Sequence, residues 1–171
     1  MAGNQQHGYV TEVGYAGQLA TNRRNTQIGG RTITGQKYPL GRGVKWNGSN
    51  KEVTPFTAIT DTFGGLLLRK GLHEDYLDAD GNYGFPPDEN VILLTEGDII
   101  VEVETAISHN DPVFCRAIAN GAGKDQIGIF RNDDDGASNT CFAVPNARWI
   151  PVWDTSDGGL SVDNLAVLSL F

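Results

Sequence analysis

The chain has 171 residues, of which 39% are hydrophobic, with 22 glycines, 7 prolines and a formal net charge of −8. This length suits one domain with its own core, and the glycine and proline content favours turns over long helices. No apolar run is long enough to cross a membrane, and the first residues lack the apolar stretch of a signal peptide. We therefore expect no membrane partner and synthesis in a cytoplasm-like compartment.

The charge divides along the chain. Residues 1–55 hold seven Lys/Arg against two acidic residues, a net charge of +5, whereas residues 56–171 have a net charge of −13. The change predicts a basic arm over residues 1–55 and an acidic body over residues 56–171, with the arm lying across an acidic surface. The alternative is a soluble domain with a solvated acidic face and an incidentally basic tail.

The first segment contains ten glycines, and its apolar residues come singly. Such a segment cannot bury enough surface to fold alone, so its aromatic residues are interpreted as anchors that pack on a partner. Residues 31–34 could add a strand to a sheet edge. The contact residues predicted here are Tyr9, Tyr15, Leu19, Arg23, Arg24, Arg31, Tyr38, Arg42 and Trp46.

From Phe56 onward, short apolar runs alternate with turn residues, which is typical of a β-sandwich or barrel. The predicted strands cover residues 64–69, 90–94, 99–104, 113–118, 126–131, 140–144, 148–153 and 165–171. Residues 96–98 are predicted to form a turn, and Asn120-Gly121 a tight hairpin. Glu102 and Glu104 alternate with apolar residues and are expected to face water. The predicted fold is all-β, a single jelly-roll-like β-sandwich or barrel with an extended N-terminal arm.

The longest loop of the body covers residues 72–89. Long ordered loops are usually functional, so this loop is predicted to be a second contact surface. Its predicted contact residues are Tyr76, Tyr83 and Phe85.

Patterns that carry chemistry are weak in this sequence. Neither Gly81 nor Gly136 fits the sixth position of a calcium loop, because the first and twelfth positions would then lack carboxylates. The acidic segments around both glycines, residues 133–135 included, are therefore interpreted as solvated hairpin tips. Cys115 and Cys141 are expected to be buried thiols, and the three histidines are isolated. No Gly-x-Ser-x-Gly elbow occurs, and the acidic body opposes nucleic-acid binding. We expect no catalytic residues, metal or cofactor; a hydrolase using residues 133–135 is a weaker alternative.

Several segments, in their order and spacing, resemble the structural cement (head decoration) proteins of tailed bacteriophages. They are residues 14–20, 38–44, 64–69, 96–101, 111–116, 120–123, 128–133 and 147–149. The resemblance implies a jelly-roll-like domain that self-associates, as a dimer rather than a trimer, across the joints between capsomers. It further implies an arm that clasps the major capsid protein on the outer surface of the virion.

The expected function is therefore a non-enzymatic cement protein that binds the capsid shell and stabilises the phage head. The rival interpretation is a carbohydrate- or receptor-binding β-sandwich on the virion surface. In that case Trp149, Trp153 and loop tyrosines would form a stacking platform. Trp149 and Trp153 are four residues apart and so point to one strand face, which core packing explains equally well.

Overall fold

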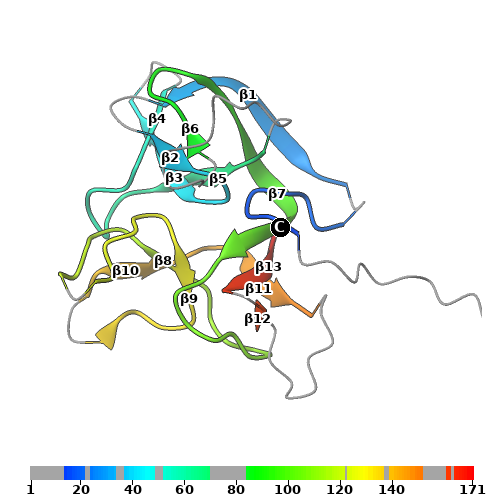
Figure 1. The fold of residues 1–171 in the computed structure, drawn as a ribbon, viewed down its shortest axis with the longest axis vertical. Coiled ribbons are helices and arrows are strands. Elements are labelled where there is room, and N and C mark those ends of the chain that lie inside the picture. Colours follow the sequence, from blue (N-terminus) through cyan, green and yellow to red (C-terminus); the bar gives the residue numbers. More distant parts are fainter. Residues whose placement is uncertain are drawn as a thin grey trace, which may run out of the picture.

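The computed structural model describes residues 14–21, 24–33, 37–48, 52–69, 84–121, 123–136, 139–151, 161–162 and 164–171. Over these residues the chain consists of β-strands and turns, without an α-helix (Figure 1). The all-β prediction is confirmed, and the mostly antiparallel sheets agree with a β-sandwich. The jelly-roll strand order stays a prediction. The described part of the chain has no helix that could span a membrane.

The strands follow the predicted order closely through the second half of the chain. They are β1 (Thr26–Ile33), β2 (Tyr38–Pro39), β3 (Gly43–Asn47), β4 (Glu52–Thr54), β5 (Phe63–Leu67), β6 (Gly84–Phe85), β7 (Asn90–Glu102), β8 (Phe114–Arg116), β9 (Phe130–Arg131), β10 (Cys141–Ala143), β11 (Ala147–Ile150), β12 (Ser161–Val162) and β13 (Leu165–Leu170).

The largest sheet closes on itself at one end. Its order is β1-β4-β3-β5-β7-β13-β11, and an additional pairing of β1 with β7 completes a ring of strands β1, β4, β3, β5 and β7. Only β1 and β4 pair in parallel within this ring. The remaining strands β13, β11 and β12 continue the sheet away from the ring, with β11 and β12 both paired to β13. There β10, β8 and β9 form a separate sheet (Figure 1).

Strand β7 belongs to both halves of the molecule: the first half is the ring, and the second half consists of the β7-β13-β11 part of the large sheet and the β10-β8-β9 sheet. Its first part pairs with β1 and β5 in the ring, and residues Gly97 to Glu102 pair with β13. Gly97 has a φ of 126°, and a Cβ there would lie 2.7 Å from the Cβ of Asn25. The turn predicted at residues 96–98 is therefore wrong: the glycine bends one continuous strand of 13 residues.

Two apolar cores match the two halves. The ring encloses Tyr38, Leu40, Val44, Val53, Leu67, Phe85, Val91 and Leu93. The second core lies between the β7-β13-β11 part of the large sheet and the β10-β8-β9 sheet, and it includes Ile99, Val101, Phe130, Trp149 and Leu168. Cys115 and Cys141 are buried free thiols, as expected from the sequence.

The described part of residues 1–55 does not form a separate arm. β1, β3 and β4 are three of the strands of the ring, and Val44 and Val53 are fully buried in its core. Ahead of them, Leu19 bridges Ile99, and the backbone N–H of Gly17 donates to the Ile100 carbonyl at 2.8 Å. Isolated apolar residues suffice to fold this segment because its backbone pairs with β5 and β7. The sequence predicted that the segment would pack on another subunit, but its described part packs on the body of its own chain. Residues 1–13 lie outside the described part.

The connection from β8 to β9 also differs from the prediction. Asn120-Gly121 was expected to make a tight hairpin, but β8 ends at Arg116 and β9 begins at Phe130. Gly121 does adopt a φ of 71°, and the N–H of Asn120 bonds to the Lys124 carbonyl inside this long connection. The dipeptide turns the chain locally, while the pairing of Phe114 with Arg131 sets the strand register.

Candidate interaction surface

Four of the predicted contact residues keep exposed side-chain surface in the isolated chain. Tyr15 is 62% exposed, Arg24 is exposed, and Leu19 and Trp46 are half-buried. Trp46 packs against the core of the ring. Among the predicted residues whose side chains the structure describes, Tyr15 and Arg24 thus present most surface to a partner.

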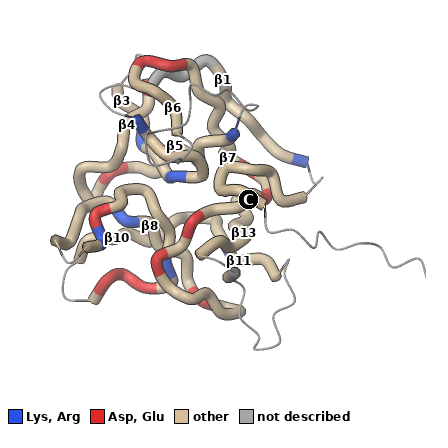
Figure 2. The backbone as a smooth tube through the Cα atoms, in the orientation of Figure 1, with Lys and Arg blue, Asp and Glu red and all other residues tan. Residues whose placement is uncertain are grey.

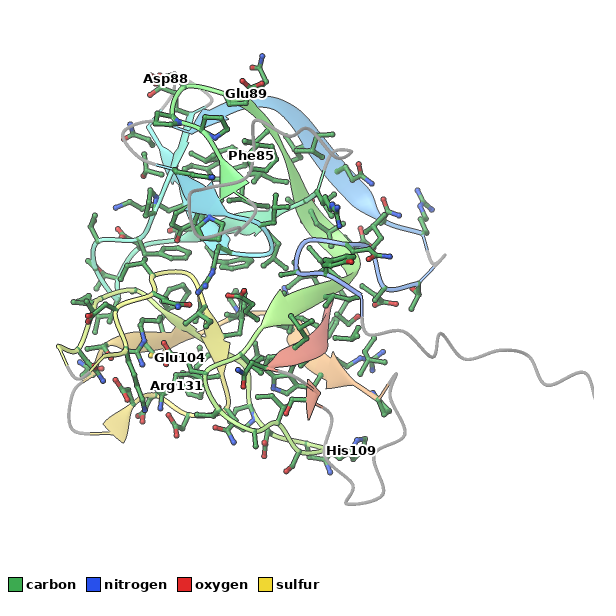
Figure 3. The ribbon with its side chains drawn as sticks, viewed as in Figure 1. Phe85, Asp88, Glu89, Glu104, His109 and Arg131 are labelled. Atoms are coloured by element: carbon green, nitrogen blue, oxygen red, sulfur yellow. The ribbon has the colours of Figure 1, made fainter. Side chains whose placement is uncertain are left out.

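Three predicted contact residues are buried, which corrects the prediction for them. Tyr38 and Arg42 are each 3% exposed and Phe85 is 0% exposed. Tyr38 lies opposite Phe85 in the β2–β6 pair, and its hydroxyl donates to the Ile127 carbonyl at 2.9 Å. Burial raises the pKa of this phenol. Phe85 lies within the ring in Figure 3, so these aromatic anchors pack inside the chain itself.

The remaining predicted residues cannot be placed in the same way. The backbone of Arg31 pairs with Val91 of β7, so residues 31–33 do add a strand to a sheet, and that sheet is their own. Tyr9, Arg23, Tyr76 and Tyr83 lie outside the described residues.

Two exposed aromatic rings are each covered by an arginine. The guanidinium of Arg69 lies 4.8 Å from the ring centre of Tyr15, and that of Arg148 lies 5.4 Å from the ring centre of Phe171. Phe171 is 64% exposed. Arginine and aromatic side chains are enriched where protein surfaces bind each other, because they offer large contact areas. Sequence reasoning included Tyr15 and missed the other three.

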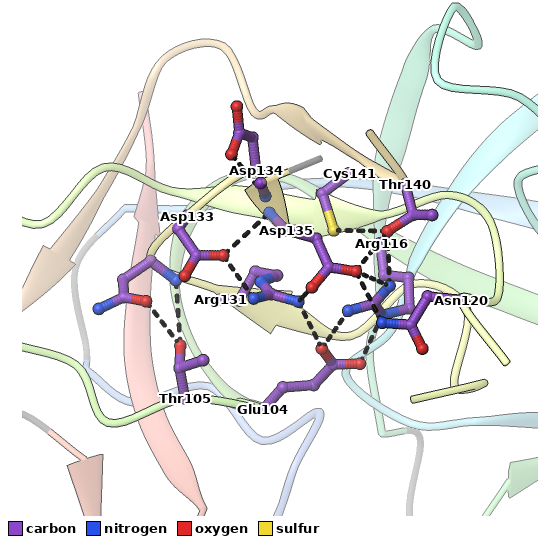
Figure 4. Close-up of polar contacts among 12 residues, drawn as sticks. Glu104, Thr105, Arg116, Asn120, Arg131, Asp133, Asp134, Asp135, Thr140 and Cys141 are labelled. Atoms are coloured by element: carbon purple, nitrogen blue, oxygen red, sulfur yellow. Dashed lines mark hydrogen bonds and ion pairs between the residues drawn. The ribbon is translucent and has the colours of Figure 1, made fainter. Parts of the chain in front are cut away.

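A buried cluster of charges ties the second half of the molecule together (Figure 4). Arg116 is fully buried and binds Glu104 through two hydrogen bonds of 2.6 Å, from Nε to Oε1 and from Nη2 to Oε2. Its Nη1 donates to Asp135 Oδ2 at 2.9 Å and to Thr140 Oγ1 at 2.8 Å. Arg131 Nη1 donates to Asp135 Oδ1 at 2.7 Å. Two arginines thus share two carboxylates.

The electrostatics of this cluster favour the charged forms of Arg116, Arg131 and Asp135. The hydrogen bonds with Glu104 raise the pKa of Arg116. Burial alone would raise the pKa of the Asp135 carboxyl, but hydrogen bonds from Thr140, Arg116 and Asn120 hold it well below its usual range. The cluster therefore connects the loop of residues 132–136 to β8, β9 and Glu104, which follows β7 closely.

The cluster corrects two sequence interpretations. Glu104 was expected to face water and Asp135 to lie in a solvated hairpin tip, but each side chain is only 8% exposed. The sequence did contain a feature that predicts this burial: Arg116 and Arg131 each lie inside an apolar run. A buried arginine requires buried carboxylates as partners. Asp133 and Asp134 are exposed, as expected.

An open cleft of about 540 Å³ lies where the N-terminal segment meets the second half. Its lining includes Tyr15, Glu102, Lys124, Gln126 and Asn164. Two of these lining residues, Glu102 and Gln126, accept hydrogen bonds from the buried Arg42, which directly precedes β3. Arg42 thus connects the ring to the end of β7 and to the β8–β9 connection. Charges of both signs line the cleft.

Charged residues are unevenly distributed along the fold. In Figure 2 acidic positions of the backbone gather at the top of the ring and in the lower half, while basic positions are scattered. Asp88 and Glu89 lie at the top in Figure 3, and His109 lies at the opposite end of the molecule. With a net charge of −8, the chain as a whole favours partners with basic patches.

The family of the chain follows from its sequence. The family model described as structural cement protein (E217 gp24/Pam3 gp6) matches residues 4–170. The chain belongs to this family of phage cement proteins. The predicted resemblance is thereby confirmed, and as a member of the family the cement protein is a structural component of the virion capsid.

A solved structure shows the same fold. A chain of "The capsid of Myoviridae Phage XM1" superposes on this cement protein with a TM-score of 0.67 and 20% sequence identity. The match covers 99% of this chain and 98% of that chain. No curated protein matches the chain.

The rival platform of tryptophans does not form as expected. Trp149 is 5% exposed, and its indole N–H donates to the Pro112 carbonyl at 3.2 Å. Its ring packs in the second core and offers no face for a sugar to stack on. Trp153 lies outside the described residues.

Proposed function

We propose that this cement protein binds the outer surface of the major capsid protein shell at the joints between capsomers, and that it stabilises the phage head without catalysis. The observation that carries the proposal is the family match over residues 4–170. A role of this kind needs a stiff body with several modest contacts. Because many copies of the protein bind around the shell, these contacts together give strong attachment.

The structure supports a stiff body. The closed ring of strands and the buried cluster of Arg116, Arg131, Glu104 and Asp135 fix both halves, and Arg42 links them. The chain therefore resists deformation between two capsomers better than a flexible tail would. We further propose that it acts as a homo-oligomer, with a dimer favoured over a trimer.

The Tyr15–Arg69 pair is the proposed centre of shell contact. Tyr15 combines 62% exposure with a position beside the open cleft, and the guanidinium of Arg69 covers its ring. Truncation of such a pair at the centre of an interface commonly costs more than 1 kcal/mol of binding free energy.

Co-sedimentation with heads purified from a phage that lacks this protein tests the proposal. The wild-type chain should bind with saturation, and the double variant Tyr15→Ala/Arg69→Ala should bind about tenfold more weakly. Ile118→Ala is the matched control, because Ile118 is 39% exposed outside this pair and should bind like wild type. Absence of wild-type binding at any concentration would overturn the proposed function.

A further inference from the structure

Strand β11 ends the large sheet, and its outer edge pairs with no described strand. The N–H of Phe171 donates to the Asn146 carbonyl at 3.0 Å, one position beyond the β11–β13 register. Hydrogen-bonded positions alternate in an antiparallel pair, so Arg148 and Ile150 direct their backbone groups toward β13. Ala147 and Trp149 therefore direct theirs toward the outer edge.

A groove of about 390 Å³ runs beside this edge. One wall is the turn of His109, Asn110 and Asp111, and the other is β11 from Arg148 to Ile150 together with Pro151, which follows it. The side chain of Arg148 is exposed at the strand. The site thus combines backbone donors and acceptors that pair with no described strand with one exposed cation, which suits an extended segment that carries a carboxylate.

We propose that this edge binds the N-terminal residues 1–13 of a second copy of the chain as an added strand. Residues 9–13, Tyr-Val-Thr-Glu-Val, have the β-branched and aromatic composition of a strand. Glu12 is the single Asp, Glu, Lys or Arg in residues 1–13, and it matches Arg148 in charge. The inference names the contact for the proposed self-association and rests on that part of the proposed function.

The length of the segment fits this exchange. It ends at Gly14, which lies against the Ile100 side chain of β7, two strands from β11 in the same sheet. Thirteen extended residues reach up to about 45 Å, whereas two strand spacings amount to about 10 Å. The segment is therefore long enough to leave its own sheet and pair with the edge of a neighbouring copy.

Charge reversal and mixing test the exchange, with molecular mass measured by sedimentation. The full chain should self-associate, and a chain that lacks residues 2–13 should stay monomeric. Glu12→Lys and Arg148→Glu should each raise the dissociation constant about tenfold. An equimolar mixture of the two variants should recover wild-type affinity, because each segment then meets an edge of opposite charge only on the other copy.

Arg24→Glu is the matched control, since Arg24 is an exposed arginine outside the groove. It should change the dissociation constant less than twofold, and it should not rescue Glu12→Lys on mixing. The proposal fails if the mixture associates no better than the single variants, or if removal of residues 2–13 leaves the mass unchanged. A monomeric chain that still decorates heads would overturn this exchange and leave shell binding standing.

Discussion

Asp135 shows how a residue in an exposed acidic loop becomes part of the core. Its two neighbours Asp133 and Asp134 face water, while its own carboxylate accepts hydrogen bonds from Arg116, Arg131, Thr140 and Asn120. Because its pKa is lowered in the folded chain, the carboxylate stabilises the fold fully above about pH 4, its unfolded value. That contribution is lost as the pH falls toward the folded pKa.

Asp135→Asn should therefore lower the free energy of unfolding at pH 7 by roughly 2–4 kcal/mol, because Arg116 and Arg131 lose a buried counter-charge. Denaturant unfolding followed by tryptophan fluorescence measures this value. Between pH 5 and pH 2 the variant should lose stability less steeply than wild type. Asp134→Asn, at an exposed position, should change stability by less than about 1 kcal/mol. Equal acid sensitivity of Asp135→Asn and wild type would contradict this role.

Asp61, in the turn before β5, is a second carboxylate whose pKa is lowered by hydrogen bonds. Burial alone would raise the pKa of its carboxyl, but the hydrogen bond from Lys45 and those from the N–H groups of Thr57 and Ala58 lower it to about 2. This carboxylate adds to the stability that is present above about pH 4 and lost in more acidic solution. Lys45 and Asp61 lie 2.9 Å apart, which fixes the turn before β5 against β3.

At the scale of the elements, the bend in β7 decides how the two halves join. A strand of 13 residues would continue straight, but the φ of 126° at Gly97 directs its second part toward β13. The close approach of Asn25 leaves no room for a side chain at this glycine. The bend therefore depends on one residue without a Cβ.

Gly97→Ala should cost roughly 2 kcal/mol or more of unfolding free energy, through backbone strain and the contact with Asn25. Gly29→Ala in the neighbouring strand β1 is the matched control. A Cβ at Gly29 would meet no atom within 4 Å, so its stability should stay within about 0.5 kcal/mol of wild type. Thermal melts of both variants decide the point, and equal melting temperatures would refute a special role for Gly97.

The strands from β5 onward were largely predictable, whereas the first strands of the ring were not. Alternation and apolar runs in the sequence indicated β5, β8, β10, β11 and β13. In β3 and β4 only the side chains of Val44 and Val53 are fully buried, so no alternation or apolar run in the sequence predicts these strands. These two strands pair with each other and, at longer sequence separation, with β5 and β1. The Arg116 cluster likewise joins residues that are separated in sequence.

In the whole molecule, the ring makes the described strands β1, β3 and β4 of the first third of the chain part of the body. Deletion of residues 2–13 removes only residues ahead of the described fold, so the cooperative thermal transition should stay within a few degrees of wild type. Deletion of residues 2–55 removes β1 to β4 and leaves β5 and β7 without these partners. Circular dichroism should then show no cooperative transition; a cooperative melt would restore the sequence-based division into arm and body.

The central claim is that this chain reinforces a phage head from outside. Heads that contain DNA but lack this protein should release their DNA at a higher temperature after saturation with the purified chain, as measured with a dye that fluoresces on free DNA. We expect the temperature of DNA release to rise by several degrees, and the rise to be smaller with Tyr15→Ala/Arg69→Ala at the same protein concentration. An unchanged release temperature at full occupancy would contradict the claim.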